Sequence, residues 1–215
     1  MKHRRDTWAY FLTAGLLRIG LKIWNRLSIF GIENVPLHGG GIIVANHTSF
    51  LDPPVIGGGV LKRRGVHFLA RGSLFSFPLG EWCLRQIQAI PIEREKGDIG
   101  ALRKGLSVIK EGKLLALFPE GTRSPDGHFQ EAKKGVGFLM AKAKIPIIPA
   151  YIDGTFQAYP KGGKWIRPKK IKVYFGTPIF PVDLEQFGKK KEAYRQISDY
   201  IMSEIKALKD SNTLN

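Results

Sequence analysis

Several features that define common protein classes are missing from this 215-residue sequence. The single cysteine, Cys83, excludes an intramolecular disulfide and a cysteine-rich zinc site, and the five histidines show no paired metal-ligand spacing. No run approaches the roughly 18 consecutive apolar residues that a membrane-spanning helix needs, and the N-terminus has no signal-peptide pattern. We therefore expect one well-cored domain without a metal site, in a composition that is compatible with a reducing compartment.

Acidic residues are scarce relative to basic ones. The chain has 18 Asp and Glu against 34 Lys and Arg, which gives a formal net charge of +16 and predicts anionic partners, either nucleic acid or an anionic membrane. The basic residues are dispersed, and no helix-turn-helix, zinc-finger or aromatic RNA-binding pattern is present. A nucleic-acid-binding module is therefore kept as a rival hypothesis, and an anionic membrane surface is the other candidate partner.

The N-terminal segment has the pattern of an amphipathic helix. The apolar residues at helical spacing are Trp8, Leu12, Leu16, Ile19, Ile23, Leu27 and Phe30. A second, basic stripe consists of Arg18, Lys22 and Arg26. Bulky aromatic residues with a basic flank are typical of a helix that lies in the membrane interface. The pattern equally fits an amphipathic helix packed on its own domain, and both interpretations stay open.

After Gly31, short apolar runs alternate with amphipathic stretches, which predicts a mixed, largely parallel α/β sheet flanked by helices. The expected strands are Gly41–Ala45, Val66–Ala70, Ile87–Ile92, Leu114–Phe118, Ile147–Ile152 and Ile171–Phe175. Helices are expected after Asp52, near Leu74–Leu84, at Ile99–Lys110, and in a C-terminal stretch with Ala193, Ile197, Ile201, Ile205 and Leu208 on one face. The tail 209–215 is expected to fray.

The stretch "IIVANHTSFLDPP" (42–54) joins a buried-strand pattern to a base and a carboxylate, His47 and Asp52. Pro53 and the turn-forming residues before it disfavour a helix here, so the loop can fold back and let the carboxylate orient one imidazole nitrogen. The other nitrogen is then left as a general base at the edge of the sheet. A compatible alternative is that Asp52 caps the following helix. Because no serine or cysteine nucleophile pattern is present, the nucleophile is expected to come from the substrate.

A second strand pattern breaks into the polar loop "FPEGTRSPDG" (118–127). Arg123 offers a planar fork that suits a phosphate, and Gly121 allows close approach of the backbone. Glu120 can orient the guanidinium or accept a hydrogen bond from a substrate hydroxyl. The alternative is a surface turn that contains an internal Glu-Arg pair.

Two further arginines, Arg71 and Arg94, follow strand patterns in the same way. One such arginine predicts nothing specific. If their strands end at the same side of the sheet as His47, however, these side chains form an anion-binding basin next to a base.

Four segments resemble, in order, the motif blocks of the lysophosphatidic acid acyltransferases, the 1-acyl-sn-glycerol-3-phosphate O-acyltransferases of phospholipid biosynthesis. They read "NHTSFLD" at 46–52, "AIPIER" at 89–94, "FPEGTRS" at 118–124 and "IPIIPAYIDGT" at 145–155. The first block contains an HxxxxD motif, and the resemblance covers about residues 31–180.

The resemblance implies an enzyme that moves a fatty acyl group from acyl-CoA or acyl carrier protein (acyl-ACP) to the sn-2 hydroxyl of lysophosphatidic acid, giving phosphatidic acid. It makes His47 the general base and Asp52 its orienting partner. The residues that would bind the acceptor or support its site are Asn46, Arg71, Arg94, Glu120, Gly121, Thr122 and Arg123. The acyl thioester is a co-substrate, and neither a bound cofactor nor a metal is implied. An acyltransferase for another acceptor, such as glycerol 3-phosphate or a different lysophospholipid, is the alternative.

The resemblance also implies a division of the chain and a location. Residues 1–30 would form an amphipathic, membrane-associating helical element, and residues 31–210 an α/β acyltransferase domain. The basic segment "KGGKWIRPKK" (161–170), with Trp165 as an interfacial anchor, either assists membrane binding or is a solvated hairpin turn. We therefore expect the enzyme at the cytoplasmic face of the membrane, peripheral or monotopic.

Overall fold

A seven-stranded mixed sheet forms the centre of the computed structural model, which describes residues 2–76, 78–86, 88–92, 98–188 and 192–213. The strands are β1 (Ser28–Phe30), β2 (Gly41–Ala45), β3 (Val66–Arg71), β4 (Ala89–Ile92), β5 (Leu114–Leu117), β6 (Ile147–Asp153) and β7 (Lys172–Phe175). Their order across the sheet is β1-β7-β6-β2-β5-β3-β4, and only the β6/β7 pair among them is antiparallel. The predicted mixed, largely parallel α/β sheet is confirmed.

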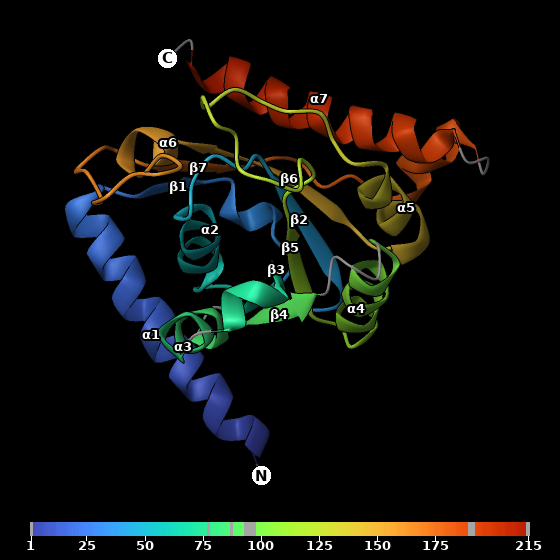
Figure 1. Ribbon diagram of the computed structural model, residues 1–215. Helices are drawn as coiled ribbons and strands as arrows, with labels where there is room; N and C mark the ends of the chain where they lie inside the picture. The colour runs from blue at the N-terminus through green and yellow to red at the C-terminus, as the bar shows by residue number, and fades with distance from the viewer. Residues whose placement is uncertain (1, 77, 87, 93–97, 189–191, 214–215) are drawn as a thin grey trace.

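Helices pack on both faces of this sheet (Figure 1). They are α1 (Lys2–Trp24), α2 (Asp52–Val60), α3 (Pro78–Gln86), α4 (Asp98–Lys110), α5 (Lys134–Ala143), the short α6 (Thr155–Ala158) and α7 (Ala193–Thr213). Short 3-10 helices occupy Ile32–Asn34, Gly72–Phe75 and Pro181–Phe187. Residues of α1, α2 and α3 pack on one face, and residues of α4, α5 and α7 pack on the other.

The central strands are apolar on both sides because both faces are covered. In β2, Ile42 and Val44 join the core on the side of α4, α5 and α7, whereas Ile43 and Ala45 join the core on the side of α1 and α2. All four side chains are almost completely buried. The continuous apolar run in the sequence therefore reflects a strand that is covered by helices on both faces. The run ends at Ala45, so the loop that contains His47 begins at Asn46.

The N-terminal helix ends earlier than the pattern of apolar residues predicts. It stops at Trp24, because Arg26 adopts a left-handed backbone conformation with φ of 48°. Asn25 donates its side-chain amide to carbonyls of the 167–169 segment at 2.9 and 3.0 Å. Residues 28–30 then form β1, which pairs in parallel with β7, so this end of the segment belongs to the sheet.

Helix α1 has two apolar faces. Tyr10, Ala14 and Leu21 are buried against the rest of the protein. Four residues of the apolar stripe read from the sequence are exposed, Leu12 51%, Leu16 61%, Ile19 56% and Ile23 75%, whereas Leu27 of that stripe is buried. Arg18 does not extend a basic surface stripe. Its guanidinium donates to the carbonyls of Gly58 and Gly59 at the C-terminal end of α2, where the helix dipole favours a cation. No helix among those described is long and apolar enough to cross a membrane.

Helix α5 was not predicted, and its glycines explain why. Gly135 and Gly137 lower the helical propensity of the segment, so the sequence signal is weak. A Cβ atom at Gly137 would overlap the backbone carbonyl oxygen of Tyr194 in α7. Gly137 therefore weakens the helix signal in the sequence and at the same time allows α5 and α7 to pack closely.

Several element ends also differ from the prediction. Helix α7 buries Ala193, Ile197, Ile201 and Ile205 as expected, but it continues to Thr213 through most of the tail that was expected to fray. Strand β4 begins at Ala89, because Gln88 lies in a turn with φ of 53°; Ile87, where the strand was expected to begin, lies outside the described residues. The helix expected near Leu74 is a 3-10 turn followed by α3.

Candidate active site

The carboxyl ends of four adjacent parallel strands meet at one edge of the sheet. Strands β2, β5, β3 and β4 are neighbours in this order and run in the same direction. The loop with His47 follows β2, the loop with Glu120 and Arg123 follows β5, and Arg71 ends β3. The sheet therefore delivers these residues to one side, as the basin hypothesis requires; Arg94, expected after β4, lies outside the described residues.

His47 and Asp52 form a close pair. The imidazole Nδ1 lies 2.8 Å from Asp52 Oδ2, and the aspartate side chain is fully buried. The same oxygen accepts hydrogen bonds from the backbone N–H groups of Thr48 and Ser49, both at 2.7 Å. The carboxylate therefore closes the loop on itself and fixes the orientation of the imidazole ring.

Asp52 is the first residue of α2, and this corrects one step of the sequence argument. Pro53 does not keep Asp52 away from the helix, because proline is compatible with the first helical turn. The carboxylate also does not cap α2, because no side-chain hydrogen bond caps the start of this helix. The backbone N–H groups that donate to Asp52 belong to Thr48 and Ser49, which precede the helix. The aspartate serves the histidine loop instead.

The outer side of the His47 ring faces a cavity. The ring stacks on Phe118 with a centroid distance of 4.1 Å and an interplanar angle of 18°, and its side chain is 17% exposed. Among the described residues, none makes a hydrogen bond to Nε2. Since Nδ1 is occupied by Asp52, Nε2 is the nitrogen that can act as a base.

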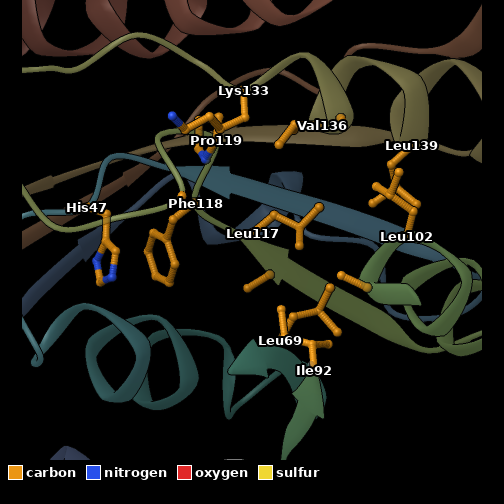
Figure 2. Close-up of a pocket in the computed structure, with 14 residues that line it drawn as sticks. His47, Leu69, Ile92, Leu102, Leu117, Phe118, Pro119, Lys133, Val136 and Leu139 are labelled. Carbon is orange, nitrogen blue, oxygen red and sulfur yellow. The ribbon is translucent and has the colours of Figure 1, made fainter. Parts of the chain in front are cut away.

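The cavity beside His47 has a volume of about 190 Å³ and runs between β5, α4 and α5. Figure 2 shows His47 and Phe118 at one end and Leu102 and Leu139 at the other. Leu69, Ile92, Leu117 and Val136 contribute further apolar wall, and Lys133 is a charged lining residue. A cavity of this kind suits an apolar chain whose reactive end lies at the histidine.

The loop after β5 holds the backbone of His47 from both sides. The His47 N–H donates to Glu120 Oε1 at 3.0 Å, and the His47 carbonyl accepts from the Ser124 N–H at 2.8 Å. Burial raises the pKa of Glu120 to about 7, while hydrogen bonds from the backbone N–H groups of His47 and Gln130 act in the opposite direction. Glu120 thus positions the catalytic loop and titrates near neutral pH.

Arg123 stacks on an aromatic ring and keeps donor capacity. Its guanidinium carbon lies 3.4 Å from the centroid of the Phe50 ring. Its buried Nη1 has no hydrogen-bond partner among the described residues, and neither has Asp52 Oδ1 or Glu120 Oε2. Burial lowers the pKa of Arg123, and the negative charge of Asp52 opposes this shift. An anion that reaches Nη1 would satisfy a donor that the protein leaves open.

Comparison with known families supports an acyl-transfer site. The family model described as Acyltransferase matches residues 26–153, which include both loops. The chain belongs to the acyltransferase family.

Similar proteins make the family assignment more specific. The 1-acyl-sn-glycerol-3-phosphate acyltransferase of Bacillus subtilis is 26% identical over 205 residues, which cover 94% of this chain and 97% of that protein. The protein of the same name from Limnanthes alba is 31% identical over 173 residues, covering 74% of this chain and 58% of its own. A crystal structure of the 1-acyl-sn-glycerophosphate (LPA) acyltransferase PlsC from Thermotoga maritima matches with a TM-score of 0.71 at 28% identity, covering 93% of this chain and 80% of that one. The family predicted from the four motif blocks is confirmed.

The remaining motif residues of this acyltransferase take different positions. Asn46 is buried, and its amide exchanges two hydrogen bonds with the backbone of Ile152 in β6, at 3.0 and 2.8 Å. Gly121 has φ of 69°, a conformation that favours glycine. Thr122 and Arg71 are exposed at the same edge of the sheet. Asn46 therefore joins the catalytic loop to β6, and Gly121 shapes the turn before Arg123.

Three residues of the acyltransferase site were missed in the sequence. Phe50 and Phe118 lie in quoted motifs, but only the folded chain shows that their rings stack on Arg123 and His47. Lys133 lines the cavity beside Gly121, and its N–H bonds to the Pro119 carbonyl. No spacing rule in "EAKKGVG" distinguishes it from its neighbours. Within the described ranges, no group of three or more His, Cys, Asp or Glu residues is placed to hold a metal ion.

Proposed function

We propose that this acyltransferase moves a fatty acyl group from an acyl thioester, acyl-CoA or acyl-ACP, to the sn-2 hydroxyl of lysophosphatidic acid and forms phosphatidic acid. The similar proteins from Bacillus subtilis and Thermotoga maritima are named for this acceptor, which supports the proposal. The observation that carries the chemistry is the His47–Asp52 pair at the end of an apolar cavity. A base beside an apolar cavity fits the deprotonation of an alcohol next to a fatty chain.

The proposed reaction uses the substrate hydroxyl as nucleophile. His47 Nε2 takes the hydroxyl proton, and Asp52 stabilises the imidazolium that forms. The substrate oxygen attacks the thioester carbonyl carbon, and the tetrahedral intermediate collapses with cleavage of the C–S bond. The leaving thiolate takes the proton from His47, so the products are an ester and a free thiol. General-base catalysis of this kind typically contributes about 10²–10⁴ in rate.

In this proposal the donor's acyl chain binds in an apolar cavity, and the acceptor's phosphate binds to cationic side chains. The donor's acyl chain enters the cavity between β5, α4 and α5, whose walls are mostly aliphatic. The acceptor's phosphate binds Arg123, whose Nη1 lacks a partner among the described residues, with Lys133 nearby at the cavity. We assign Asn46 and Glu120 to positioning His47 and not to substrate contact, because their hydrogen bonds go to protein backbone.

The same proposal places the enzyme on an anionic membrane surface, at the cytoplasmic face. The end of α1 contacts the basic segment 161–170, since Trp24 Nε1 donates to the Ile166 carbonyl at 3.0 Å. Trp165 is 72% exposed, which suits an interfacial side chain. Each basic residue near an anionic leaflet contributes about 1 kcal/mol, so a few of them hold the protein where its lipid substrate lies.

The purified full chain tests the function directly. Lysophosphatidic acid, glycerol 3-phosphate and a neutral lysophospholipid are each offered with acyl-CoA and with acyl-ACP, and the products are identified by mass spectrometry. We expect phosphatidic acid as the main product, and His47→Ala to lower kcat by at least about 10²-fold with an unchanged melting temperature. Preferential acylation of glycerol 3-phosphate would instead establish the alternative acceptor, and His47→Ala activity within tenfold of wild type would refute the base assignment.

A further inference from the structure

A second apolar cavity, which we call the α1 groove, lies between α1, α3 and the start of α2. It has a volume of about 680 Å³ and is lined by Thr13, Leu16, Leu17, Gly20, Leu21, Trp24, Asn25, Phe50, Leu51, Pro54, Trp82, Leu84 and Ile166. None of these residues lines the cavity beside His47. The groove and that cavity are therefore separate apolar spaces, and the mechanism above uses only one of them.

The two spaces lie on either side of the same catalytic loop. His47 lines the first cavity, whereas Phe50 and Leu51, only a few positions further along, line the groove. Phe50 also stacks on Arg123, so one ring touches both the proposed phosphate site and the groove. A molecule with a phosphate on Arg123 thus has apolar wall directly beside its headgroup.

Resting on the proposed function, we propose that the α1 groove binds the acyl chain of the lysophosphatidic acid acceptor. This substrate carries its phosphate and its chain on either side of the reacting hydroxyl. With the phosphate at Arg123 and the chain over Phe50 in the groove, the hydroxyl between them lies at the loop of His47. The donor chain then takes the first cavity, and each of the two chains of the product has its own site.

The walls of the groove favour a lipid chain over other occupants. Leu21 and Leu51 at its floor are each only 7% exposed, whereas the lining residues Leu16, Trp24 and Trp82 are 61%, 54% and 57% exposed, so the groove is a recess that opens at the outer face of α1. A bilayer that contacts Ile19 and Ile23 on that outer face does not fill such a recess. The amide of Asn25 is occupied by the carbonyls of Arg167 and Lys169, so this lining residue offers little to a peptide backbone.

Gly20 provides a way to fill the groove without disturbing the fold. It lines the groove within α1, and a Cβ atom added there meets no other atom within 4 Å. Gly20→Trp places a large side chain in the groove, and Gly20→Leu is a smaller variant for the case that tryptophan prevents folding. Because leucine favours a helix more than glycine does, the smaller variant is expected to fold. Gly100→Trp in α4, where a Cβ atom also meets nothing within 4 Å, is the matched control.

The experiment measures kcat/KM for hexanoyl, octanoyl and decanoyl lysophosphatidic acids as monomers, without detergent or vesicles and at saturating donor. Each buried methylene contributes about 0.8 kcal/mol, so we expect kcat/KM of wild type and of Gly100→Trp to rise roughly fourfold per methylene. Gly20→Trp should flatten this dependence to less than about 1.5-fold per methylene, with the donor KM unchanged.

Other outcomes overturn the proposal in distinguishable ways. A wild-type kcat/KM that is independent of the acceptor's chain length would show that the acceptor's acyl chain does not bind in the groove. An equal dependence of kcat/KM on chain length in wild type and Gly20→Trp would show the same. Unchanged slopes together with weaker vesicle binding in Gly20→Trp would assign the groove to the bilayer, and a change in oligomeric state would assign it to a second copy of the chain. Failure of wild type to acylate any lysophosphatidic acid refutes the proposed function itself.

Discussion

The loops that follow β2 and β5 contrast in how they use their polar groups. In the first, Asp52 Oδ2 receives His47 and two backbone N–H groups, so the loop is closed by its own hydrogen bonds. In the second, Arg123 Nη1 and Glu120 Oε2 are buried without a partner among the described residues. In the first loop the buried atom that lacks a partner among the described residues is an acceptor, Asp52 Oδ1, whereas the second loop keeps open a donor, Arg123 Nη1, that an anion can use.

The largest effect should come from breaking the closed loop at Asp52. Asp52→Asn keeps an oxygen that can accept the backbone N–H groups but removes the negative charge that stabilises the imidazolium. We expect kcat to fall by about 10²–10³-fold while the melting temperature changes little. Asp52→Ala should lose both activity and stability, because two buried N–H groups then lack an acceptor. Equal melting curves for the two variants would contradict this account of the loop.

The open loop should respond in substrate binding and not in chemistry. Arg123→Ala removes the proposed phosphate partner, and we expect the acceptor KM to rise about 10- to 100-fold, as a charge-assisted hydrogen bond of about 1.5–3 kcal/mol implies. The acceptor KM of Arg123→Lys should lie between those of wild type and Arg123→Ala, since lysine keeps the charge but lacks the planar fork that stacks on Phe50. Steady-state kinetics with each substrate varied in turn checks this, and a rise confined to the donor KM would refute it.

Glu120 joins the two loops, and its titration gives a pH signature. Its pKa is raised to about 7 in the folded protein, so the folded state binds more protons than the unfolded state. Its contribution to stability is fully present below about pH 4.5 and is lost as the pH rises through about 7, by about 3 kcal/mol at most.

The variant Glu120→Gln isolates this contribution. Urea unfolding at pH 5 and at pH 8 should show a smaller loss of stability with rising pH in the variant than in wild type. Glutamine keeps an oxygen for the His47 N–H, so acceptor KM at pH 8 should change little. A large rise in the acceptor KM of Glu120→Gln at pH 8 would instead indicate that Glu120 contacts the substrate.

The smallest effect is expected at Lys133, which extends the open loop into the cavity. An exposed charge contributes about 1 kcal/mol or less, so Lys133→Ala should raise the acceptor KM by roughly two- to fivefold. Lys134→Ala removes the adjacent exposed lysine, which does not line the cavity, and serves as the control. Indistinguishable kinetics of the two variants would exclude Lys133 from the site.

The contrast between the loops also explains what the sequence could predict. His47 and Asp52 meet within one short loop, so spacing and turn chemistry were enough to propose the pair. Parallel strand patterns were enough to place Arg123 near it. The stacking of Arg123 on Phe50 and the hydrogen bond from the His47 N–H to Glu120 join distant segments, and no local pattern encodes them.

The fold, like the site, has features that a local sequence pattern predicts and others that depend on contacts between distant segments. The buried strands β2, β5 and β6 were located to within a residue or two because a run of apolar residues is a local property. The end of α1 at Trp24 depends on Asn25 binding the 167–169 segment, and the glycine-rich α5 depends on α7. Such features arise from packing, which overrides local propensity.

Helix α2 couples two parts of the molecule that look independent. Its first residue is Asp52, and the carbonyls of Gly58 and Gly59 near its other end are held by Arg18 of α1. Nine helical residues make a strut of about 14 Å, too short to bend appreciably. Arg18 and Asp52 therefore lie at opposite ends of one short helix, so the placement of α1 and the placement of the carboxylate that orients His47 are set together.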